Sequence, residues 1–414
     1  MLKLRFLAII LIFLALQTKP GLADWQFQVI SRIPTPGMAQ AVEVGGNYAF
    51  VADWNAGLTI FNVSYPNSPF PVGSFNHGGF VNAVRLHGNL AFLARWNNGV
   101  TILNVSNPAQ PESIGAFDTP GVAVDIAISG TLLFVADLYN GLVILDIANP
   151  VNPTQVGHIP ARNYFYSVAV LDTVIYIADQ GFGLLTYTLG DTAHPVERNA
   201  RRLAVGASAI AIRDGFLYLS GGGSGLIVFD LDNPLAPDSL TRIDTPGFLN
   251  QVCLADTFAF LADETAGIFA YSLSSPALPR SLGFFDSPGT ARGCAAYGYY
   301  VLLADGDTLF VLLPEYPNAI ERADDHLPGS FSLAAFPNPF NGNVSIDFGL
   351  PCDGHIELSI FDIAGRKVSG LISGNYRAGD YRVSWGADGL CSGVYYAVLT
   401  GGGSRSAVRL TLLK

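Results

Sequence analysis

The chain has 414 residues, of which half are apolar and only 13% are charged. This composition suits strands buried on both faces better than a solvated helical surface. The net charge of −11 argues against a nucleic-acid partner, because phosphate binding needs a basic surface. The length allows two or more domains.

Residues 1–23 are predicted to be a secretory signal peptide. Lys3 and Arg5 precede an apolar run, Phe6–Leu16, and small residues occupy the −3 and −1 positions of a cleavage site before Asp24. The run is short for a transmembrane helix, so an uncleaved membrane anchor is the less favoured alternative. We expect an exported protein with no membrane span after the signal is removed.

A repeated phrase of about 42 residues organises most of the chain. The segment Asn47–Asp53, a three-residue spacer and Gly57–Asn62 form its first copy. Each copy divides into four short stretches of β-branched and aromatic residues, which predict strands. A period of 40 to 50 residues built of short strands is typical of a propeller blade. The seven copies start 42 residues apart, at Asn47, Asn89, Thr131, Thr173, Gly215, Thr257 and Tyr299.

The N-terminal strand is predicted to complete the last blade. Phe27–Ile33, followed by Pro34–Gly37, matches the fourth strand of the repeat and its Asp-Thr-Pro-Gly loop at 118–121. Pairing of this strand with the seventh copy would close the circle and remove the exposed sheet edges. We therefore predict an all-β fold, with a seven-bladed β-propeller over residues 24–313.

The third strands of the repeat resemble those of a known family. Leu142–Asp146 reads Leu-Val-Ile-Leu-Asp, and Leu58–Asn62, Val100–Asn104 and Leu226–Asp230 are variants of it. Residues 27–313 therefore resemble the LVIVD-repeat family of bacterial β-propellers. The resemblance implies a propeller and rarely implies an activity. The Gly-His and Trp-Asp markers of WD40 repeats are absent, so the partners of that family are not expected here.

One register position carries a carboxylate in five of the seven copies. The residues at this position, which ends the second strand, are Asp53, Arg95, Asp137, Asp179, Gly221, Asp263 and Asp305. The five aspartates are candidates for a cation ring, or for an acid and base pair, near one face of the propeller. The alternative is that each Asp accepts N–H groups of its own turn. No metal site is predicted beyond this possible ring, because the histidines and cysteines lack ligand spacing.

Aromatic residues gather on the same predicted face. Trp and Tyr together with Arg are typical of surfaces that bind peptides or glycans. The alternative is that these side chains close the channel mouth and pack between blades. The candidate binding residues are Trp54, Arg95, Trp96, Tyr139, Tyr164 and Phe182, with Phe80, Phe165, Tyr166 and Phe248 in or beside the loops between blades.

No enzyme motif or cofactor motif is found. The sequence lacks a Gly-x-Ser-x-Gly elbow, a phosphate-binding loop and a His-Glu-x-x-His motif. The run Gly221–Gly225 suggests a phosphate cradle, but no helix is predicted to follow it. We therefore expect no cofactor.

Residues 314–330 read as a polar linker, and a different pattern follows. The phrase Phe336–Asn341, the turn at Gly365-Arg366 and the ending Val408–Lys414 resemble the C-terminal sorting domain of type IX secretion cargo. The resemblance covers residues 331–414 and implies an immunoglobulin-like fold and recognition by the type IX secretion machinery. Alternating strands with one Trp also predict a β-sandwich. An ordinary accessory sandwich is the alternative.

The four cysteines form two candidate groups. Cys352 and Cys391 lie in turn-like contexts of the C-terminal domain and are a candidate disulfide, which export permits. Cys253 and Cys294 lie in the first strands of neighbouring repeats, one register position apart. Because side chains alternate along a strand, we expect these two to face opposite sides as free thiols.

The leading hypothesis is a secreted or cell-surface protein without catalytic activity, whose propeller is a platform that binds an extracellular protein or glycan. One alternative is an exported lyase or hydrolase that uses the Asp-lined face, although fold alone never proves an activity. Another is a purely structural surface protein.

Overall fold

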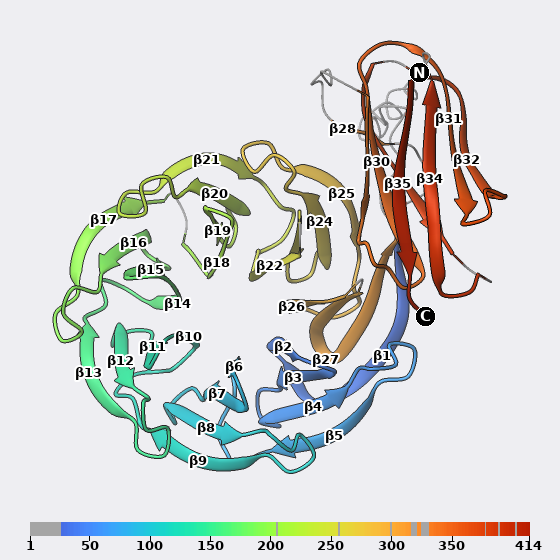
Figure 1. The fold of residues 1–414 in the computed structure, drawn as a ribbon. Coiled ribbons are helices and arrows are strands. Elements are labelled where there is room, and N and C mark those ends of the chain that lie inside the picture. Colours follow the sequence, from blue (N-terminus) through green and yellow to red (C-terminus); the bar gives the residue numbers. More distant parts are fainter. Residues whose placement is uncertain are drawn as a thin grey trace, which may run out of the picture. The chain divides into compact units, whose positions relative to one another are not determined.

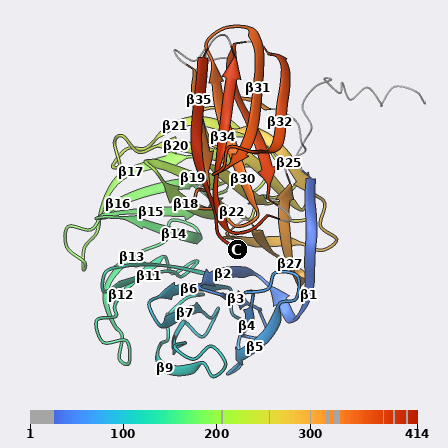
Figure 2. The ribbon, with the colours of Figure 1, turned by 45° about the vertical axis from the view of Figure 1, so that its right-hand side comes forward.

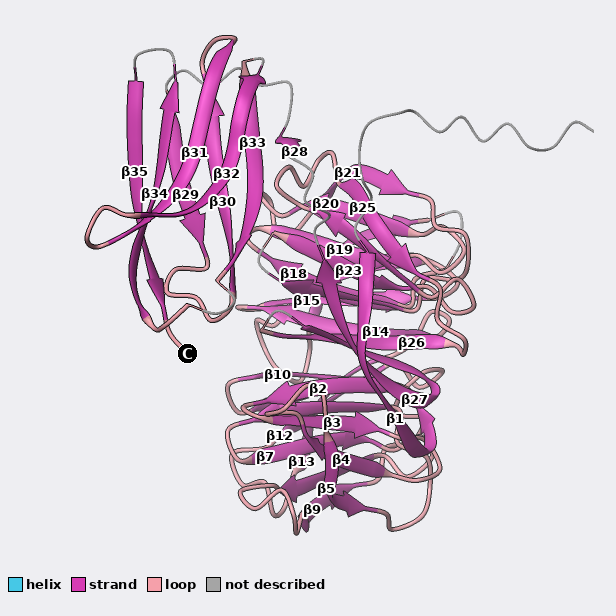
Figure 3. Ribbon diagram, turned by 90° about the vertical axis from the view of Figure 1, so that its right-hand side faces the viewer, coloured by secondary structure: helices cyan, strands magenta, loops and turns pink. Residues whose placement is uncertain are grey.

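The computed structural model describes residues 26–203, 206–255, 257–298, 300–315, 321–323, 331–376, 378–387, 390–401 and 404–414. The chain divides into two compact units, of which one is Trp25–Glu315 and the other contains Tyr316–Lys414. The predicted signal peptide and most of the predicted linker lie outside the described residues. Every regular element that the structure describes is a strand (Figure 3).

The first unit is a circle of sheets with the first strand of each sheet nearest the centre (Figure 1). Blade 1 has β2 (Ala41–Gly45), β3 (Tyr48–Ala52), β4 (Leu58–Asn62) and β5 (Phe70–Phe75). Blade 2 has β6 (Ala83–His87), β7 (Leu90–Ala94), β8 (Val100–Asn104) and β9 (Glu112–Phe117). Blade 3 has β10 (Asp125–Ser129), β11 (Leu132–Ala136), β12 (Leu142–Asp146) and β13 (Thr154–Ile159).

Blades 4 to 6 repeat this antiparallel order. Blade 4 has β14 (Phe165–Leu171), β15 (Val174–Asp179), β16 (Gly183–Thr188) and β17 (Val196–Arg202). Blade 5 has β18 (Ala209–Arg213), β19 (Phe216–Ser220), β20 (Leu226–Asp230) and β21 (Asp238–Ile243). Blade 6 has β22 (Gln251–Ala255), β23 (Phe258–Ala262), β24 (Ile268–Ser272) and β25 (Arg280–Phe285).

Blade 7 closes the circle with the N-terminal strand, as predicted. It contains β26 (Ala291–Tyr297), β27 (Tyr300–Glu315) and β1 (Gln26–Ala39), and Figure 2 shows β1 beside β27. The long β27 takes the places of the second and third strands: its first part pairs with β26 and the part after Gly306 pairs with β1. Ile33 is equivalent to Phe75 of blade 1, which pairs with Leu58. The residue of blade 7 equivalent to Leu58 is Phe310, but Ile33 pairs with Leu309 instead. The loop between the second and third strand positions is therefore one residue shorter in blade 7.

The burial pattern explains the apolar composition. Second and third strands such as β11 and β12 are buried along almost their whole length, because neighbouring blades cover both of their faces. Fourth strands such as β9 are mostly exposed or half-buried. On β9 a Cβ at Gly115 would collide with the backbone carbonyl of Pro150, so glycine lets the next blade approach closely.

Cys253 and Cys294 meet between blades 6 and 7. The Cys294 thiol donates to the carbonyl oxygen of Phe260 at 3.4 Å, and burial together with a hydrogen bond to Cys294 raises the pKa of Cys253. Cys253 lies on the side of blade 6 that faces blade 7, and Cys294 lies on the side of blade 7 that faces blade 6. The predicted opposite orientations therefore bring the two thiols together. Both thiols are free.

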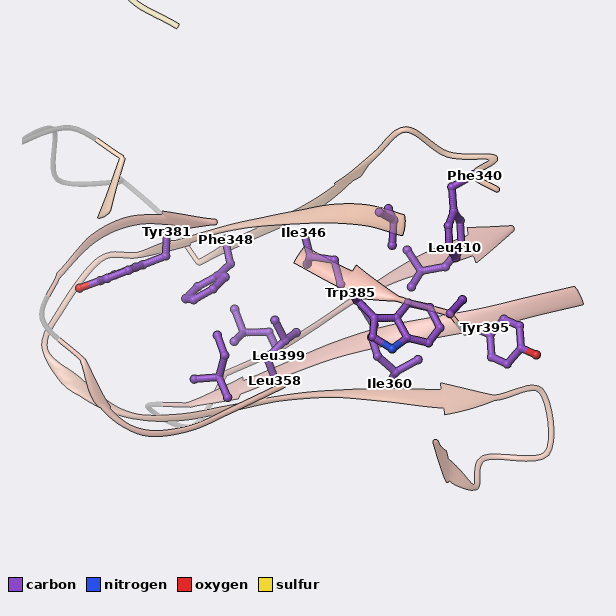
Figure 4. Close-up of a cluster of buried hydrophobic side chains, with 14 of the residues drawn as sticks. Phe340, Ile346, Phe348, Leu358, Ile360, Tyr381, Trp385, Tyr395, Leu399 and Leu410 are labelled. Atoms are coloured by element: carbon purple, nitrogen blue, oxygen red, sulfur yellow. The ribbon is translucent and has the colours of Figure 1, made fainter. Parts of the chain in front are cut away.

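The second unit contains two four-stranded sheets. One has the order β28 (Glu321–Ala323), β33 (Gly379–Gly386), β30 (Asn343–Leu350) and β29 (Ser332–Phe336). The other has the order β32 (Lys367–Tyr376), β31 (Gly354–Asp362), β34 (Gly393–Gly401) and β35 (Ser404–Leu412). Both contribute to one core around Trp385, which lies 5.8 Å from Phe340 and from Tyr395 between ring centroids (Figure 4). The arrangement is consistent with the predicted immunoglobulin-like sandwich.

The opening phrase of this unit is tied to its last strand. The backbone N–H of Phe340 donates to the carbonyl of Thr411 at 2.9 Å, and the N–H of Leu413 donates to the carbonyl of Phe340 at 2.8 Å. The Asn338 side chain accepts the N–H of Thr411 at 2.9 Å. Two segments about 70 residues apart in the chain therefore hold each other in register.

The predicted Cys352–Cys391 disulfide is absent, since both thiols are free and exposed. Cys352 precedes the start of β31, whose residue Ile356 pairs with Gly401. Cys391 precedes Tyr395, which pairs with Asp362 at the other end of β31. The two cysteines therefore lie at opposite ends of a nine-residue strand, on the order of 25 Å long, and a disulfide requires Cα atoms within about 7 Å.

Candidate functional site

One face of the propeller carries both the loops that join second to third strands and the loops that join successive blades. We call it the loop face. The two kinds of loop are hydrogen-bonded to each other by short antiparallel bridges, such as Trp54 to Val81 and Trp96 to Ala123. This face was predicted from the repeat, and the bridges fix the loops between blades against the loops within them.

We call the register position that ends the second strands the clamp column: Asp53, Arg95, Asp137, Asp179, Gly221, Asp263 and Asp305. Asp137 shows what this position does. Its carboxylate accepts the hydroxyl of Thr119 at 2.6 Å, the N–H of Gly121 at 2.8 Å and the side-chain amide of Asn140 at 2.9 Å. Thr119 and Gly121 belong to the Asp-Thr-Pro-Gly loop that enters blade 3. The aspartate therefore ties the preceding loop between blades to the end of the second strand.

The same device recurs in other blades. Asp179 accepts backbone N–H groups of its own turn, from Gly181 at 2.9 Å and Phe182 at 3.0 Å, and also the backbone N–H of Asn163, the equivalent of Gly121 on the preceding loop. The remaining bonds are Gly37 N to Asp53 at 3.1 Å, Thr59 Oγ1 to Asp53 at 3.0 Å, Gly247 N to Asp263 at 2.7 Å, Thr245 Oγ1 to Asp263 at 2.9 Å, Gly289 N to Asp305 at 2.8 Å and Ser287 Oγ to Asp305 at 2.9 Å. Asp179 thus forms the local turn cap expected from the sequence, and all five aspartates also reach back to the previous loop.

Arg95 holds its preceding loop as a hydrogen-bond donor, whereas the aspartates hold theirs as acceptors. The loop before it reads His77-Gly78-Gly79 and has no Thr or Pro. The Arg95 guanidinium donates to the carbonyls of His77, at 3.4 Å, and Gly78, and to the hydroxyl of Thr101 at 2.9 Å. Its side chain is only 9% exposed, so Arg95 holds a loop and does not offer its donors at the surface. This placement corrects its assignment as a contact residue.

The five aspartates do not line an open face, because each is at most 1% exposed. Burial raises the pKa of Asp53, Asp137, Asp179 and Asp305, and the hydrogen bonds from the loops lower it only in part. Among the described residues no group of three or more His, Cys, Asp or Glu side chains could hold a metal ion. The predicted ring is therefore a set of separate loop clamps.

Several predicted aromatic residues come together on the loop face. Trp54 stacks on Phe80 with ring centroids 4.7 Å apart, and the Trp96 ring meets it edge-on at 5.1 Å. We call these three residues the aromatic cluster. Tyr139 and Tyr164 are exposed by 59% and 45%, while Phe182 is half-buried beneath the Arg162 guanidinium, 5.1 Å from its ring.

Two of the clustered side chains occupy a strained backbone position. Trp54 and Trp96 have φ of 45° and 50°, in the left-handed region, as do the equivalent residues Leu138 and Glu264 of blades 3 and 6, at 41° and 43°. The equivalent residues of blades 5 and 7 are Gly222 and Gly306. A residue other than glycine costs on the order of 1 kcal/mol there, and this cost is present in four blades.

A cavity of about 330 Å³ lies on the propeller axis below the loop face. One residue from each blade lines it, at the start of the first strand or just before it. We call these seven residues, 42 apart, the axial ring: Gln40, Asn82, Val124, Tyr166, Ser208, Asn250 and Arg292. No two neighbouring blades have the same residue here, so the cavity is chemically asymmetric. This column is not among the residues predicted from the sequence, although its variation within a regular repeat was the signal that could have found it.

Charged groups also cross between blades in this channel. Arg85 lies 3.5 Å from Glu43 and 3.1 Å from Asp125, and the other Asp125 oxygen accepts the hydroxyl of Ser167 at 2.6 Å. Burial alone would lower the pKa of Arg85, and the two carboxylates more than offset it, so its pKa is raised. Burial also raises the pKa of Glu43. This network joins blades 1 to 4 and satisfies Arg85 and Asp125 internally.

Comparison with known proteins agrees with this architecture. Residues 36–77, 78–119 and 120–159 match the LVIVD repeat, and residues 334–412 match the secretion system C-terminal sorting domain. The WD40 β-propeller domain of Doa1 has a TM-score of 0.58 at 9% identity, covering 70% of this chain and 98% of that one. The Myceliophteria thermophila Cps50 (Swd1) β-propeller domain has a TM-score of 0.59 at 8% identity, covering 69% and 99%. No curated protein matches.

The molecule is therefore a β-propeller joined to a sorting domain. Residues 36–159 of its propeller are LVIVD repeats, and its C-terminal domain directs export by type IX secretion to the cell surface or the extracellular space. The similarity to the solved propellers, at such low identity, concerns the fold alone. Within the described residues no helix is long and apolar enough to cross a membrane.

Proposed function

We propose that the propeller is a non-catalytic binding platform for an extracellular protein or glycan, and that the loop face makes the contact. The observation that carries the proposal is the aromatic cluster, in which Trp54 and Trp96 occupy left-handed backbone positions. Paired tryptophans supply a large contact area with few rotamers to immobilise.

The surroundings of the cluster support the same reading. Phe80, Tyr139, Tyr164 and Phe248 are all exposed on loops of this face, by 38% to 59%. Exposed aromatic groups gathered on one face are typical of interaction sites. The alternative of a lyase or hydrolase gains no open acid and base pair from the clamp column, because its carboxylates are buried and already hydrogen-bonded.

The proposal is tested with residues 25–414 on glycan and peptide arrays, comparing the wild type with the double variant Trp54→Ala/Trp96→Ala. Loss of two hot-spot aromatics should weaken binding at least tenfold. The matched control is Phe70→Ala/Phe284→Ala, which removes two exposed aromatics from outer strands β5 and β25 and should leave binding unchanged.

Equal binding by wild type and the tryptophan variant would contradict the proposed surface. Absence of any array ligand for the wild type would contradict the platform itself and favour a purely structural role. Unfolding measured by circular dichroism separates a lost contact from a lost fold.

A further inference from the structure

The axial cavity is lined by a guanidinium, that of Arg292, which forms no hydrogen bond or ion pair with the described residues. Four charged side chains line it: Arg85, Asp125, Glu264 and Arg292. Arg85 and Asp125 neutralise each other at 3.1 Å. The buried Nε of Arg292 has no hydrogen-bond partner. Within the part of the chain that the structure describes, neither Arg292 nor Glu264 forms an ion pair with another residue. A buried N–H donor without an acceptor costs folding free energy, so a ligand that brings an acceptor to this guanidinium would be stabilised there.

Three of the other polar residues of the axial ring donate to the next blade. Asn82 donates to the carbonyl of Val124 at 2.7 Å, and Ser208 donates to the carbonyl of Leu249 at 2.8 Å. Asn250 donates more weakly to the carbonyl of Ala291 at 3.3 Å. Arg292, at the junction where the circle closes, makes no equivalent bond with a described residue.

The remaining polar residues of the cavity include several acceptors. Asn82 and Asn250 each use one amide N–H on a backbone carbonyl, so each keeps one N–H that can donate and a side-chain oxygen that can accept. Glu264 and Tyr166 also line the cavity. A ligand that matches these groups has one carboxylate for Arg292 and hydroxyl or ammonium groups for the acceptors.

We propose that the axial cavity binds a small molecule that carries one carboxylate beside several hydrogen-bond donors, and that Arg292 holds the carboxylate. The volume of about 330 Å³ lies at the lower end of small-molecule sites and accommodates one sugar ring or one amino acid. An acidic sugar and an amino acid share this chemistry. The site lies on the axis, requires neither Trp54 nor Trp96, and goes beyond the contact proposed for the loop face.

The test is calorimetric titration of residues 25–414 with two matched pairs of probes. D-glucuronate is compared with D-glucose, and L-serine is compared with L-serinamide, so each pair differs in the carboxylate. We expect one acidic probe to bind at least about tenfold more tightly than its neutral counterpart, the ratio that one charge-assisted hydrogen-bonded pair supplies. Which pair shows the difference distinguishes a sugar from an amino acid.

Variants then assign the carboxylate to Arg292. Arg292→Gln should weaken the acidic probe about tenfold or more, and Arg292→Lys should give an intermediate affinity, because it keeps the charge but loses the planar pair of donors. Arg198→Gln, on the exposed outer strand β17, is the matched control and should bind as the wild type does. If Arg292→Gln does not fold, Tyr166→Phe serves instead, with a several-fold loss expected.

The proposal is overturned if neither acidic probe binds more tightly than its neutral counterpart, or if Arg292→Gln retains wild-type affinity. Trp54→Ala/Trp96→Ala should leave the acidic probe's affinity unchanged. A loss there would show that the axial cavity is not an independent site, whereas array binding lost with probe binding retained would separate the two surfaces.

Discussion

Two columns of the repeat pass through all seven blades, and their side chains behave in opposite ways. The clamp column keeps one residue type in five blades, and its side chains are buried and hydrogen-bonded to loops. The axial ring changes from blade to blade and leaves donors and acceptors facing a cavity. In this repeat, the regular clamp column thus holds the fold together, and the variable axial ring has polar groups that are free to bind a ligand.

The clamp column itself contains a comparison between blades 2 and 3. Where the loop reads Thr-Pro-Gly, Asp137 accepts from it, and where the loop reads His-Gly-Gly, Arg95 donates to its carbonyls. The clamp residue is therefore an acceptor where its loop donates hydrogen bonds, and a donor where its loop accepts them. This pairing explains why Arg95 breaks the column without marking a binding site.

The largest expected effect comes from reversing that polarity. Arg95→Asp places a carboxylate against the carbonyls of His77 and Gly78, and we expect it to destabilise the fold by about 3–5 kcal/mol in urea denaturation. The rescue variant adds His77→Thr, whose hydroxyl can donate to the new carboxylate as Thr119 donates to Asp137. It should recover at least about 1 kcal/mol. If the rescue variant is no more stable, loop and clamp are not coupled.

Removal of a matched clamp should be next in size. Asp137→Ala leaves the Thr119 hydroxyl and the Gly121 N–H without their acceptor, and we expect a loss of about 2–4 kcal/mol. Asp118→Ala is the control, because Asp118 is exposed in the same loop, and its change should stay within about 0.5 kcal/mol. Equal effects of the two substitutions would contradict the clamp.

The clamp should also leave a signature in the pH dependence of stability. Burial raises the pKa of Asp137, so the folded chain binds its proton more tightly than the unfolded chain does. Stability from this group is complete below the unfolded pKa of about 4 and is lost as the pH rises through the raised folded pKa. The wild type should therefore lose stability relative to Asp137→Asn as the pH rises from about 4 toward neutrality, in denaturation measured at each pH. An opposite slope would show that hydrogen bonding outweighs burial.

The smallest effect is expected at the contact between Cys253 and Cys294. Other blades have Ala or a charged residue at the first position and Val or Ile at the second. Cys253→Ala/Cys294→Val restores a combination that blades 5 and 6 already use, Ala211 with Val252. It should change the free energy of unfolding by less than about 1.5 kcal/mol. A larger loss would give the thiol pair a role beyond packing.

The repeat predicted much of the fold and little of the site. Strand order, blade number and closure through Phe27–Ile33 follow from the 42-residue register. The register does not predict the shorter loop of blade 7, which pairs Ile33 with Leu309 and keeps the side chains of the strand on their proper faces. The partners of Asp137 could not be read from its own turn, because they lie 16 and 18 residues earlier on another loop. Likewise, alternation places Cys352 and Cys391 in turns but does not say at which end of the sandwich each turn lies.

The axial ring illustrates the same limit. The sequence shows that position 292 differs from its equivalents, but only the folded circle brings it to the axis and leaves its Nε without a partner. The aromatic residues were predicted to share a face because their loops recur. Their contact distances depend on the bridges between loops, which no single repeat contains.

The most direct test measures stability and acidic-probe affinity together in Asp137→Ala and Arg292→Gln. Asp137→Ala should lose about 2–4 kcal/mol of stability and keep the affinity of the wild type for the probe. Arg292→Gln should keep its stability and lose at least about tenfold in affinity. Wild-type affinity in Arg292→Gln, or a loss of affinity in Asp137→Ala equal to that in Arg292→Gln, would contradict the division between residues that hold the propeller and residues that bind.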